Sequence, residues 1–306
     1  MRSTKPSRTA SKIARFVLLL DATPRFAGLL PSGSAAAVEA ILRASGTIRP
    51  AAIDVMRQPR AQRLAASVEA WAGRGQILWF GLRKRWFADA VEAAIADGTT
   101  QLLVVGAGFD PLTALVAQRH PGVLCVEIAA PKTAAAKRTG LSGAGLERVN
   151  LHVCGIDLAS TPLEEARGTT PWRSDARSVV VAEGLLMYLA EAAVTGFLTS
   201  VRRSCAPGSR LALSCMDVDD AGRPRLGTRV DGTIRLGLRL AGESFRWGAG
   251  PADLRAFLAD AGYRMLAQPD LAALRERYLD PLELRDEPLS PYEHLALAEV
   301  LSGPEA

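Results

Sequence analysis

With 306 residues, the chain is long enough for one large domain or two small ones, and too long for a small disulfide-stabilised module. Hydrophobic residues make up 48% and charged residues 23%, which is typical of a globular protein and excludes a disordered one. The net charge of +5 comes from residues 1–20, which hold five basic side chains and no acidic one, whereas the rest of the chain has 32 of each. The composition therefore gives little support to nucleic-acid binding.

The cysteines, histidines and apolar runs exclude further classes. No Cys-x-x-Cys occurs among the four cysteines, and no two Cys or His residues lie three or four positions apart, so no metal site is expected. No uncharged apolar run approaches the about 18 residues that a membrane span needs. The run Phe16 to Leu20, between Arg15 and Asp21, is too short for the core of a signal peptide. We therefore predict a cytoplasmic protein that does not contact membranes.

Residues 1–98 are predicted to form short helices, separated by Pro and Gly residues. Three sets of apolar residues recur at helical spacing, and Asp97-Gly98 ends the last helix. The three sets are Val38, Ile41 and Leu42; Leu64, Val68 and Trp71; and Phe87, Val91, Ala94 and Ile95. This region is predicted to cover the rest of the protein and to act as a lid.

From residue 101 onward, short apolar runs alternate with amphipathic stretches. Five runs predict strands, at 102–105, 123–128, 149–154, 178–182 and 211–216. Helices are predicted at 111–119, 131–141, around 194–201 and at 251–261, and further short strands around Phe245 and at 263–266. Continuous apolar strands alternating with helices indicate a doubly wound, mainly parallel α/β sheet that is covered on both faces. Residues 99–306 are thus predicted to be a Rossmann-like core.

Ligands of such sheets bind outside the carboxyl ends of the strands. Gly106-Ala107-Gly108 directly follows the first predicted strand, and glycine lets the backbone approach a ligand closely. A Gly-x-Gly turn is also used for geometry alone. A dinucleotide site would need a third glycine where this chain has Pro111, which disfavours a nicotinamide-dependent oxidoreductase.

Acidic residues follow the next three predicted strands. Glu127 could accept hydrogen bonds from a ribose. Asp157, beside the backbone amide of Leu158, could accept a hydrogen bond from the amino group of adenine. Glu183, next to glycine, suits a ligand ammonium. Each of these acids alone could equally be a solvated strand end or a turn residue. Together with the glycines they predict a pocket for S-adenosylmethionine.

Two more roles in such a pocket need side chains. Arg83 and Arg85 are candidates for binding the methionine carboxylate of the cofactor. A carboxylate acceptor of the methyl group needs no catalytic base, whereas a hydroxyl acceptor would benefit from one. Tyr188 and Asp217 are the catalytic candidates, with His152 ranked below them because a histidine within a strand is more often a packed core residue.

Four segments together resemble the leucine carboxyl methyltransferase-like family, which includes bacterial O-methyltransferases of small molecules. The segments are Arg83–Asp89, Gln101–Asp110, Val126–Pro131 with Lys137, and Glu183–Leu189. Asp157-Leu158 also matches, and the likeness begins near Pro6 and extends more weakly to Gly262. The resemblance implies a Rossmann-like methyltransferase fold, S-adenosylmethionine as cofactor and a small-molecule acceptor.

The resemblance also implies roles for individual residues. Arg83 would hold the methionine carboxylate, and Gly106 and Gly108 would lie along the cofactor. Glu183 would face the methionine end, and Tyr188 would stand near the transferred methyl group. Asp157 and Leu158 would frame the adenine.

One position departs from the family's pattern. The family reads Glu-x-Asp-x-Pro after the second strand, whereas this chain has Ala129 between Glu127 and Pro131. The missing hydrogen bond would cost about tenfold to a hundredfold in affinity. We predict that Glu127 binds the ribose in place of the missing aspartate. Glu127→Ala should then bind S-adenosylmethionine more weakly than wild type in calorimetry.

Three alternatives stay open besides the oxidoreductase. A nucleic-acid methyltransferase would often carry Asn-Pro-Pro-aromatic where this chain has Glu183-Gly184. A non-catalytic binding protein with this fold is supported by Ala129. The acceptor could also be the terminal carboxylate of a protein instead of a small molecule. The oligomeric state is not indicated by the sequence.

Overall fold

The computed structural model describes residues 7–158, 161, 163–164, 168, 170–225, 232 and 244–302. Its strands are β1 (Gln101–Val105), β2 (Leu124–Ala129), β3 (Leu151–Gly155), β4 (Ser178–Ala182), β5 (Arg210–Met216), β6 (Tyr263–Ala267) and β7 (Glu293–Val300). Its helices are α1 (Arg8–Asp21), α2 (Ser34–Ala44), α3 (Pro50–Met56), α4 (Pro59–Ala72), α5 (Gln76–Ala96), α6 (Leu112–Arg119), α7 (Pro131–Gly143), α9 (Glu191–Ser204), α11 (Pro251–Asp260) and α12 (Leu271–Tyr278). Short 3₁₀ turns cover Ala27–Leu29, Leu186–Tyr188 and Asp280–Leu282.

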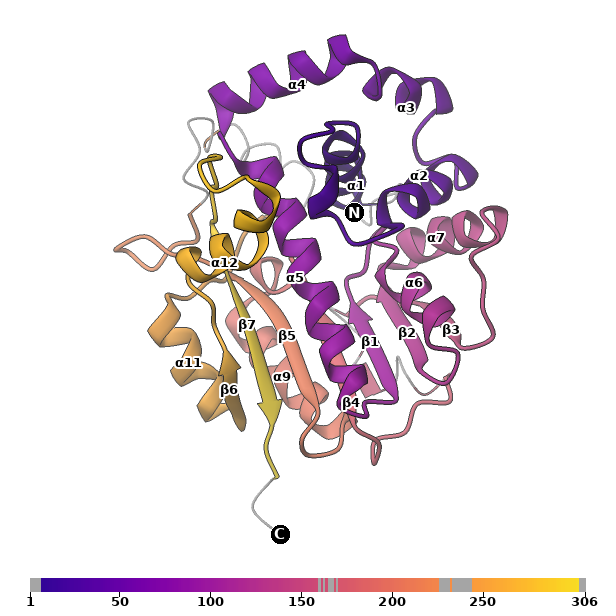
Figure 1. Cartoon of the computed structure of the whole chain (residues 1–306). Helices are drawn as coiled ribbons and strands as arrows, with labels where there is room; N and C mark the ends of the chain where they lie inside the picture. Colours follow the sequence, from indigo (N-terminus) through magenta and orange to yellow (C-terminus); the bar gives the residue numbers. More distant parts are fainter. Residues whose placement is uncertain are drawn as a thin grey trace.

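The strands form one seven-stranded sheet in the order β3-β2-β1-β4-β5-β7-β6 (Figure 1). β1 to β5 are parallel, and β7 runs antiparallel between β5 and β6. The strand order reverses between β1 and β4. Because β1 to β5 are parallel, their carboxyl ends all lie at the same edge of the sheet. The predicted α/β fold is confirmed, and this reversal is the place where such sheets bind ligands.

Alternate residues of each central strand pack on opposite faces of the sheet, as the period of two requires. Leu102 and Val104 of β1 join a hydrophobic cluster with α5 and α6. Leu103 and Val105 join a second cluster with α9 and α11. Because both faces are covered, every residue of β1 and β4 is buried, which explains their continuous apolar sequences.

Two predictions in the C-terminal third differ from the structure. The strand expected around Phe245 is wrong, since residues 244–250 have no regular structure. Their backbone instead donates hydrogen bonds to the 3₁₀ turn after β4 and to the end of β5, from Arg246 N to Met187 O (2.7 Å) and from Ala249 N to Met216 O (3.0 Å). β7 was not predicted, and it completes the sheet by pairing with β5 and β6.

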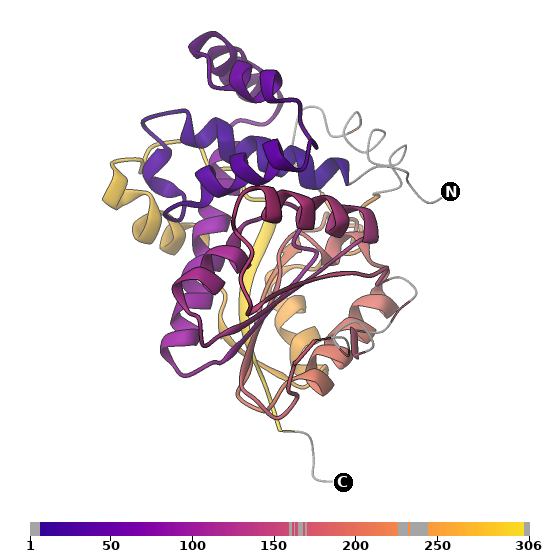
Figure 2. The same cartoon turned by 90° about the vertical axis from the view of Figure 1, so that its right-hand side faces the viewer.

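Helices α1 and α2 lie over the carboxyl-end edge of the sheet, and α3 and α4 lie beyond them (Figures 1 and 2). The apolar face of α2 is buried against α7, where a Cβ on Gly140 would come within 2.6 Å of the carbonyl oxygen of Ile41. One hydrophobic cluster extends from α1 and α2 into the strands. The division of the chain at residue 98 stays a prediction.

Helix α4 has the opposite orientation to the one that amphipathic helices usually adopt. Its apolar residues face solvent, with Leu64 66% and Trp71 62% exposed. The less exposed side instead holds small or polar side chains, such as Ala65 and Glu69, and Oε1 of Glu69 accepts a hydrogen bond from the backbone N of Ile77 at 2.7 Å. In Figures 1 and 2, α4 lies at the outer end of the molecule, beyond α1 and α2.

This orientation predicts different costs for the same substitution in two helices. Leu64→Ala in α4 should change the free energy of unfolding by less than about 0.5 kcal/mol. Leu42→Ala in α2 should cost about 2–5 kcal/mol, because Leu42 is fully buried and its loss leaves a cavity. Urea unfolding of both variants tests this. Equal costs would mean that the apolar face of α4 is buried in solution.

Candidate functional site

A cavity of about 370 Å³ lies at the carboxyl ends of β1 and β4, under the N-terminal helices. This volume is in the range of small-molecule sites. Its wall is formed by helices α1, α2 and α5 and by the turns after β1, β2 and β4. The starts of α6, α7 and β7, the end of β5 and the segment around Phe245 complete it. Residues of these elements include Lys12, Phe16, Val38, Trp79, Phe80, Arg83, Lys84, Gly106, Ala107, Gly108, Asp110, Ala129, Ala130, Thr133, Glu183, Gly184, Tyr188, Met216, Phe245 and Glu293.

The glycine turn after β1 has a conformation that requires glycine. Gly106 has φ +78° and Gly108 has φ +57°, in the left-handed region. A Cβ on Gly108 would also stand 2.9 Å from the Cβ of Ala10 in α1. The turn therefore serves two purposes, since it redirects the chain into α6 and lets α1 approach the sheet edge over the cavity.

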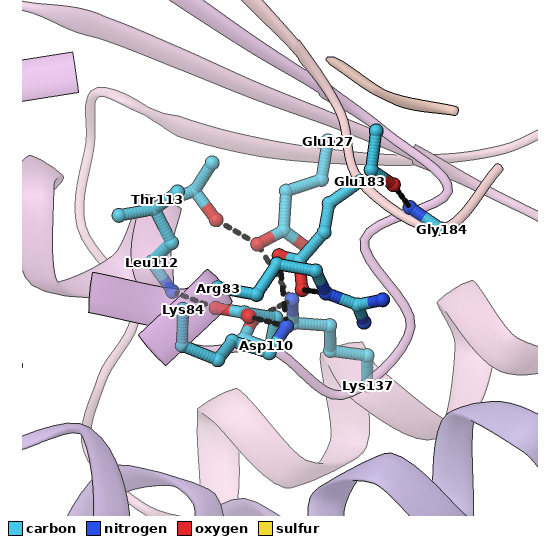
Figure 3. A network of polar contacts seen from close by, with 10 residues as sticks. Arg83, Lys84, Asp110, Leu112, Thr113, Glu127, Lys137, Glu183 and Gly184 are labelled. Atoms are coloured by element: carbon cyan, nitrogen blue, oxygen red, sulfur yellow. Dashed lines mark hydrogen bonds and ion pairs between the residues drawn. The ribbon is translucent and has the colours of Figure 1, made fainter. Parts of the chain in front are cut away.

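Seven ionisable side chains form a row of alternating charge beside the cavity, called here the charge chain. In order they are Glu293, Arg83, Glu183, Lys84, Asp110, Lys137 and Glu127. Figure 3 shows most of them converging from α5, α7 and the ends of β1, β2 and β4. Such a buried row is stable only when each charge has a partner of opposite sign.

Arg83 of α5 lies between two carboxylates at the cavity end of the charge chain. Its Nε donates to Oε1 of Glu183 at 2.8 Å, and its Nη1 donates to both oxygens of Glu293, at 2.6 and 2.8 Å. The side chain is 4% exposed, and its guanidinium lies 4.8 Å from the ring centre of Phe80. Burial alone would lower the pKa of Arg83, but Glu293 and Glu183 outweigh it and raise that pKa, so the charge is kept.

The third guanidinium nitrogen of Arg83, Nη2, faces the turn after β4. It stands 3.6 Å from the place where a Cβ of Gly184 would be. Within the part of the chain that the structure describes, no group accepts a hydrogen bond from Nη2. The backbone N of Gly184 is held by Oγ of Ser214 at 2.9 Å, which fixes the turn. Nη2 is therefore the atom of Arg83 that can take a ligand carboxylate.

Lys84 and Asp110 continue the charge chain on the next positions. Lys84 Nζ donates to Oε2 of Glu183 at 2.9 Å and forms an ion pair with Asp110. Oδ1 of Asp110 accepts the backbone N–H of Leu112 at 2.8 Å, at the start of α6. Burial opposes both charges, but the pKa of Lys84 is raised by Asp110 and Glu183, and Lys84 and Lys137 lower the pKa of Asp110. Both side chains stay ionised.

The far end of the charge chain is fully buried. Lys137 Nζ donates to Oε1 of Glu127 at 2.6 Å, and neither side chain is exposed to solvent. Lys137 also donates to the backbone carbonyl of Asp110, and the hydroxyl of Thr113 donates to Glu127. Burial raises the pKa of Glu127 by more than Lys137 lowers it.

Glu127 thus has protein partners, and it does not belong to the cavity wall described above. At the end of β2 the wall consists of Ala129, Ala130 and Thr133 instead. The predicted contact of Glu127 with a ribose stays a prediction.

The structure brings some of the candidate residues together and leaves others apart. Those in the cavity wall are Arg83, Gly106, Ala107, Gly108, Glu183 and Tyr188. Those outside it are Glu127, Asp157, Leu158, Asp217 and His152. Tyr188 packs on Phe245 with ring centres 5.5 Å apart. Arg85, the alternative to Arg83, pairs with Asp89 on the surface of α5.

Asp217, after β5, is engaged by two side chains. Its Oδ2 accepts from Arg225 at 2.7 Å, and its Oδ1 lies 3.2 Å from Nε2 of His294. Burial opposes ionisation, but hydrogen bonds from His294, the Val218 backbone and Arg225 outweigh it and lower the pKa of Asp217. A carboxylate with a lowered pKa is a weak base.

The residues that the sequence reasoning missed are those whose role depends on distant partners. Glu293 lies 210 positions from Arg83, on a strand that was not predicted, so no local signal marked it. Lys84 and Asp110 stand within the segments that carry the family resemblance, but their pairing crosses from α5 to the turn after β1. Among the described residues, no cluster of His, Cys, Asp and Glu could hold a metal ion.

A sequence model of the family described as leucine carboxyl methyltransferase matches residues 36–202, more than half of the chain. A curated protein of Mycobacterium bovis, named "Putative S-adenosyl-L-methionine-dependent methyltransferase", is 35% identical over 156 residues, covering 50% of this chain and 46% of the relative. Another protein of the same organism and name is 26% identical over 255 residues, covering 80% and 74%. The chain thus spans about half the length of the first of these relatives and about three quarters of the second.

A solved structure of an O-methyltransferase family protein from Burkholderia thailandensis is 16% identical, with a TM-score of 0.49 over 86% of this chain and 67% of that chain. Within the described residues, no helix is both long and apolar enough to span a membrane.

Proposed function

Since this chain belongs to the leucine carboxyl methyltransferase family, we propose that it transfers a methyl group from S-adenosylmethionine to an oxygen of a small molecule. The observation that carries the proposal is the position of Arg83. It is buried in the cavity wall between Glu183 and Glu293, beside the glycine turn, at the point where the strand order reverses. The names of the relatives agree with this cofactor.

The residues present fit the methionine half of this cofactor. Nη2 of Arg83 would take the carboxylate, and Glu183 would attract the ammonium. Gly106 and Gly108 leave room for a ligand along the turn after β1. For the adenine, Asp157 and Leu158 remain the proposed partners, and they follow β3, which pairs with β2.

When bound, S-adenosylmethionine supplies a methyl carbon that its sulfonium already activates. The chain's own task is then to align the acceptor and to exclude water. Helix α1 covers the cavity from one side, and Phe80, Tyr188 and Phe245 supply flat apolar surfaces. Tyr188 is proposed to orient the acceptor next to Glu183.

The state of the acidic groups favours an acceptor that needs no base. Asp110 and Asp217 both have lowered pKa values, and Asp217 lies outside the cavity wall. Glu183 is bound by two cations. We therefore favour a carboxylate as the methyl acceptor over an alcohol.

The test combines binding with a transfer assay. S-adenosylhomocysteine should raise the midpoint of thermal unfolding, and NAD should not. Methyl transfer from labelled S-adenosylmethionine is then screened over free carboxylic acids, phenols and a peptide ending in leucine. We expect product with a small apolar carboxylic acid. Stabilisation without transfer to any acceptor would favour the non-catalytic alternative, and no response to either ligand would contradict the proposal.

A further inference from the structure

The two ends of the charge chain differ in what they face. It begins and ends with a carboxylate, so four acids alternate with three cations. The Glu127 end is fully buried and lies outside the cavity wall. The Glu293 end is part of that wall. Of the two carboxylates that end the charge chain, only Glu293 therefore faces a ligand in the cavity.

Glu293 is also the carboxylate of the cavity wall with the fewest cations. Glu183 is bound by both Arg83 and Lys84. Asp110 is paired with Lys84 and also feels Lys137. Both oxygens of Glu293 accept from one nitrogen, Nη1 of Arg83. No second cation among the described residues lies within ion-pair distance of Glu293.

The fold holds Glu293 in place through regular structure. It is the first residue of β7, where it pairs in register with Met216 at the end of β5. Met216 belongs to the same cavity wall. A side chain fixed on a paired strand keeps its position better than one on a loop, as a selective site requires.

We propose that Glu293 is a specificity-determining residue, which makes the cavity prefer a positively charged sulfonium ligand to its neutral thioether. This inference rests on the proposed function, whose donor and product differ by one positive charge at sulfur. In a wall of low dielectric constant, one unit charge changes the binding of another a few ångströms away by about tenfold or more. Glu183 cannot supply this preference alone, because two cations already compensate it.

The experiment compares two dissociation constants in matched variants. Isothermal titration calorimetry gives Kd for S-adenosylmethionine and S-adenosylhomocysteine with wild type, Glu293→Gln and Glu299→Gln. Glutamine keeps the shape and an oxygen acceptor for Arg83 but removes the charge. Glu299 is the control, since it lies on the same strand and pairs with the exposed Arg264.

In Glu293→Gln, the ratio of the two Kd values should shift about tenfold in favour of S-adenosylhomocysteine. In Glu299→Gln it should stay within about twofold of wild type. The ratio cancels any change in Arg83 that affects both ligands alike, because both carry the same carboxylate. Glu293→Asp, which keeps the negative charge, should keep the wild-type ratio of the two Kd values even if both ligands bind more weakly.

An equal loss of affinity for both ligands in Glu293→Gln would overturn the proposal, since Glu293 would then act only by holding Arg83. An unchanged ratio with unchanged affinities would overturn it as well. If Glu293→Gln does not fold, Glu293→Asp provides the test. A tenfold difference between its ratio of Kd values and the wild-type ratio would also overturn the proposal. A wild-type protein that binds neither ligand would instead contradict the proposed function itself.

Discussion

Arg83→Met is expected to bind S-adenosylhomocysteine about a hundredfold more weakly than wild type and to lose about 3–5 kcal/mol of unfolding free energy. The affinity falls because Nη2 is the proposed donor to the ligand carboxylate. The stability falls because Glu183 and Glu293 lose the cation that lies between them in a buried wall. Calorimetry and urea unfolding measure the two effects separately.

Arg85→Met is the matched control for this variant. Arg85 lies two positions away on α5, and its ion pair with Asp89 is partly exposed to solvent. Its loss should change stability by less than about 0.5 kcal/mol and leave binding unchanged. Arg83→Lys should remain impaired, because a lysine cannot bind two carboxylates and a ligand in the planar arrangement of a guanidinium. A fully active Arg83→Lys would contradict the proposed role of Nη2.

Lys137→Met is expected to destabilise the protein by about 3–5 kcal/mol, whereas the same substitution at the one exposed lysine of this helix should cost little. It leaves Glu127 buried without its cation, and within the described residues Oε2 of Glu127 already has no hydrogen-bond partner. The double variant Lys137→Met with Glu127→Gln should recover most of this loss, because it removes the uncompensated charge. Lys132→Met, at an exposed position of α7, is the control.

The same pair makes a prediction about pH. Burial raises the pKa of Glu127 in the folded protein, so folding favours its protonated form. At low pH the carboxyl group is protonated in both the folded and the unfolded state, so its raised pKa does not change the free energy of unfolding. As pH rises past the pKa of the unfolded state, the unfolded chain ionises first and the free energy of unfolding falls, until pH passes the pKa of the folded state. Lys137→Met should therefore lose stability as pH rises above about 4, the range in which the unfolded chain ionises this glutamate, relative to the double variant. Parallel pH profiles of the two variants would show that Glu127 is not the cause.

Much of the fold could be predicted from the sequence because the central strands are buried on both faces. Such strands are continuous apolar runs, which stand out between polar segments, and β1, β2, β4 and β5 were located by this signal. β7 gave no such signal, since its burial is interrupted by partly exposed positions. The aromatic residues around Phe245 favour a strand in the sequence. Residues 244–250 form none, because that preference counts only where a partner strand is available.

The order of residues along the chain is enough to tell which of them follow each parallel strand, and therefore that the glycine turn and Glu183 reach the same edge of the sheet. This follows from chain connectivity, because parallel strands all end on one side. The partners of these residues depend on how the chain packs in three dimensions. Glu127 is bound by Lys137, Arg83 is joined by Glu293 from the far end of the chain, and the apolar face of α4 is exposed. The reason is that a charge or an apolar side chain is stabilised by whatever lies within a few ångströms, and distance along the chain carries no information about that.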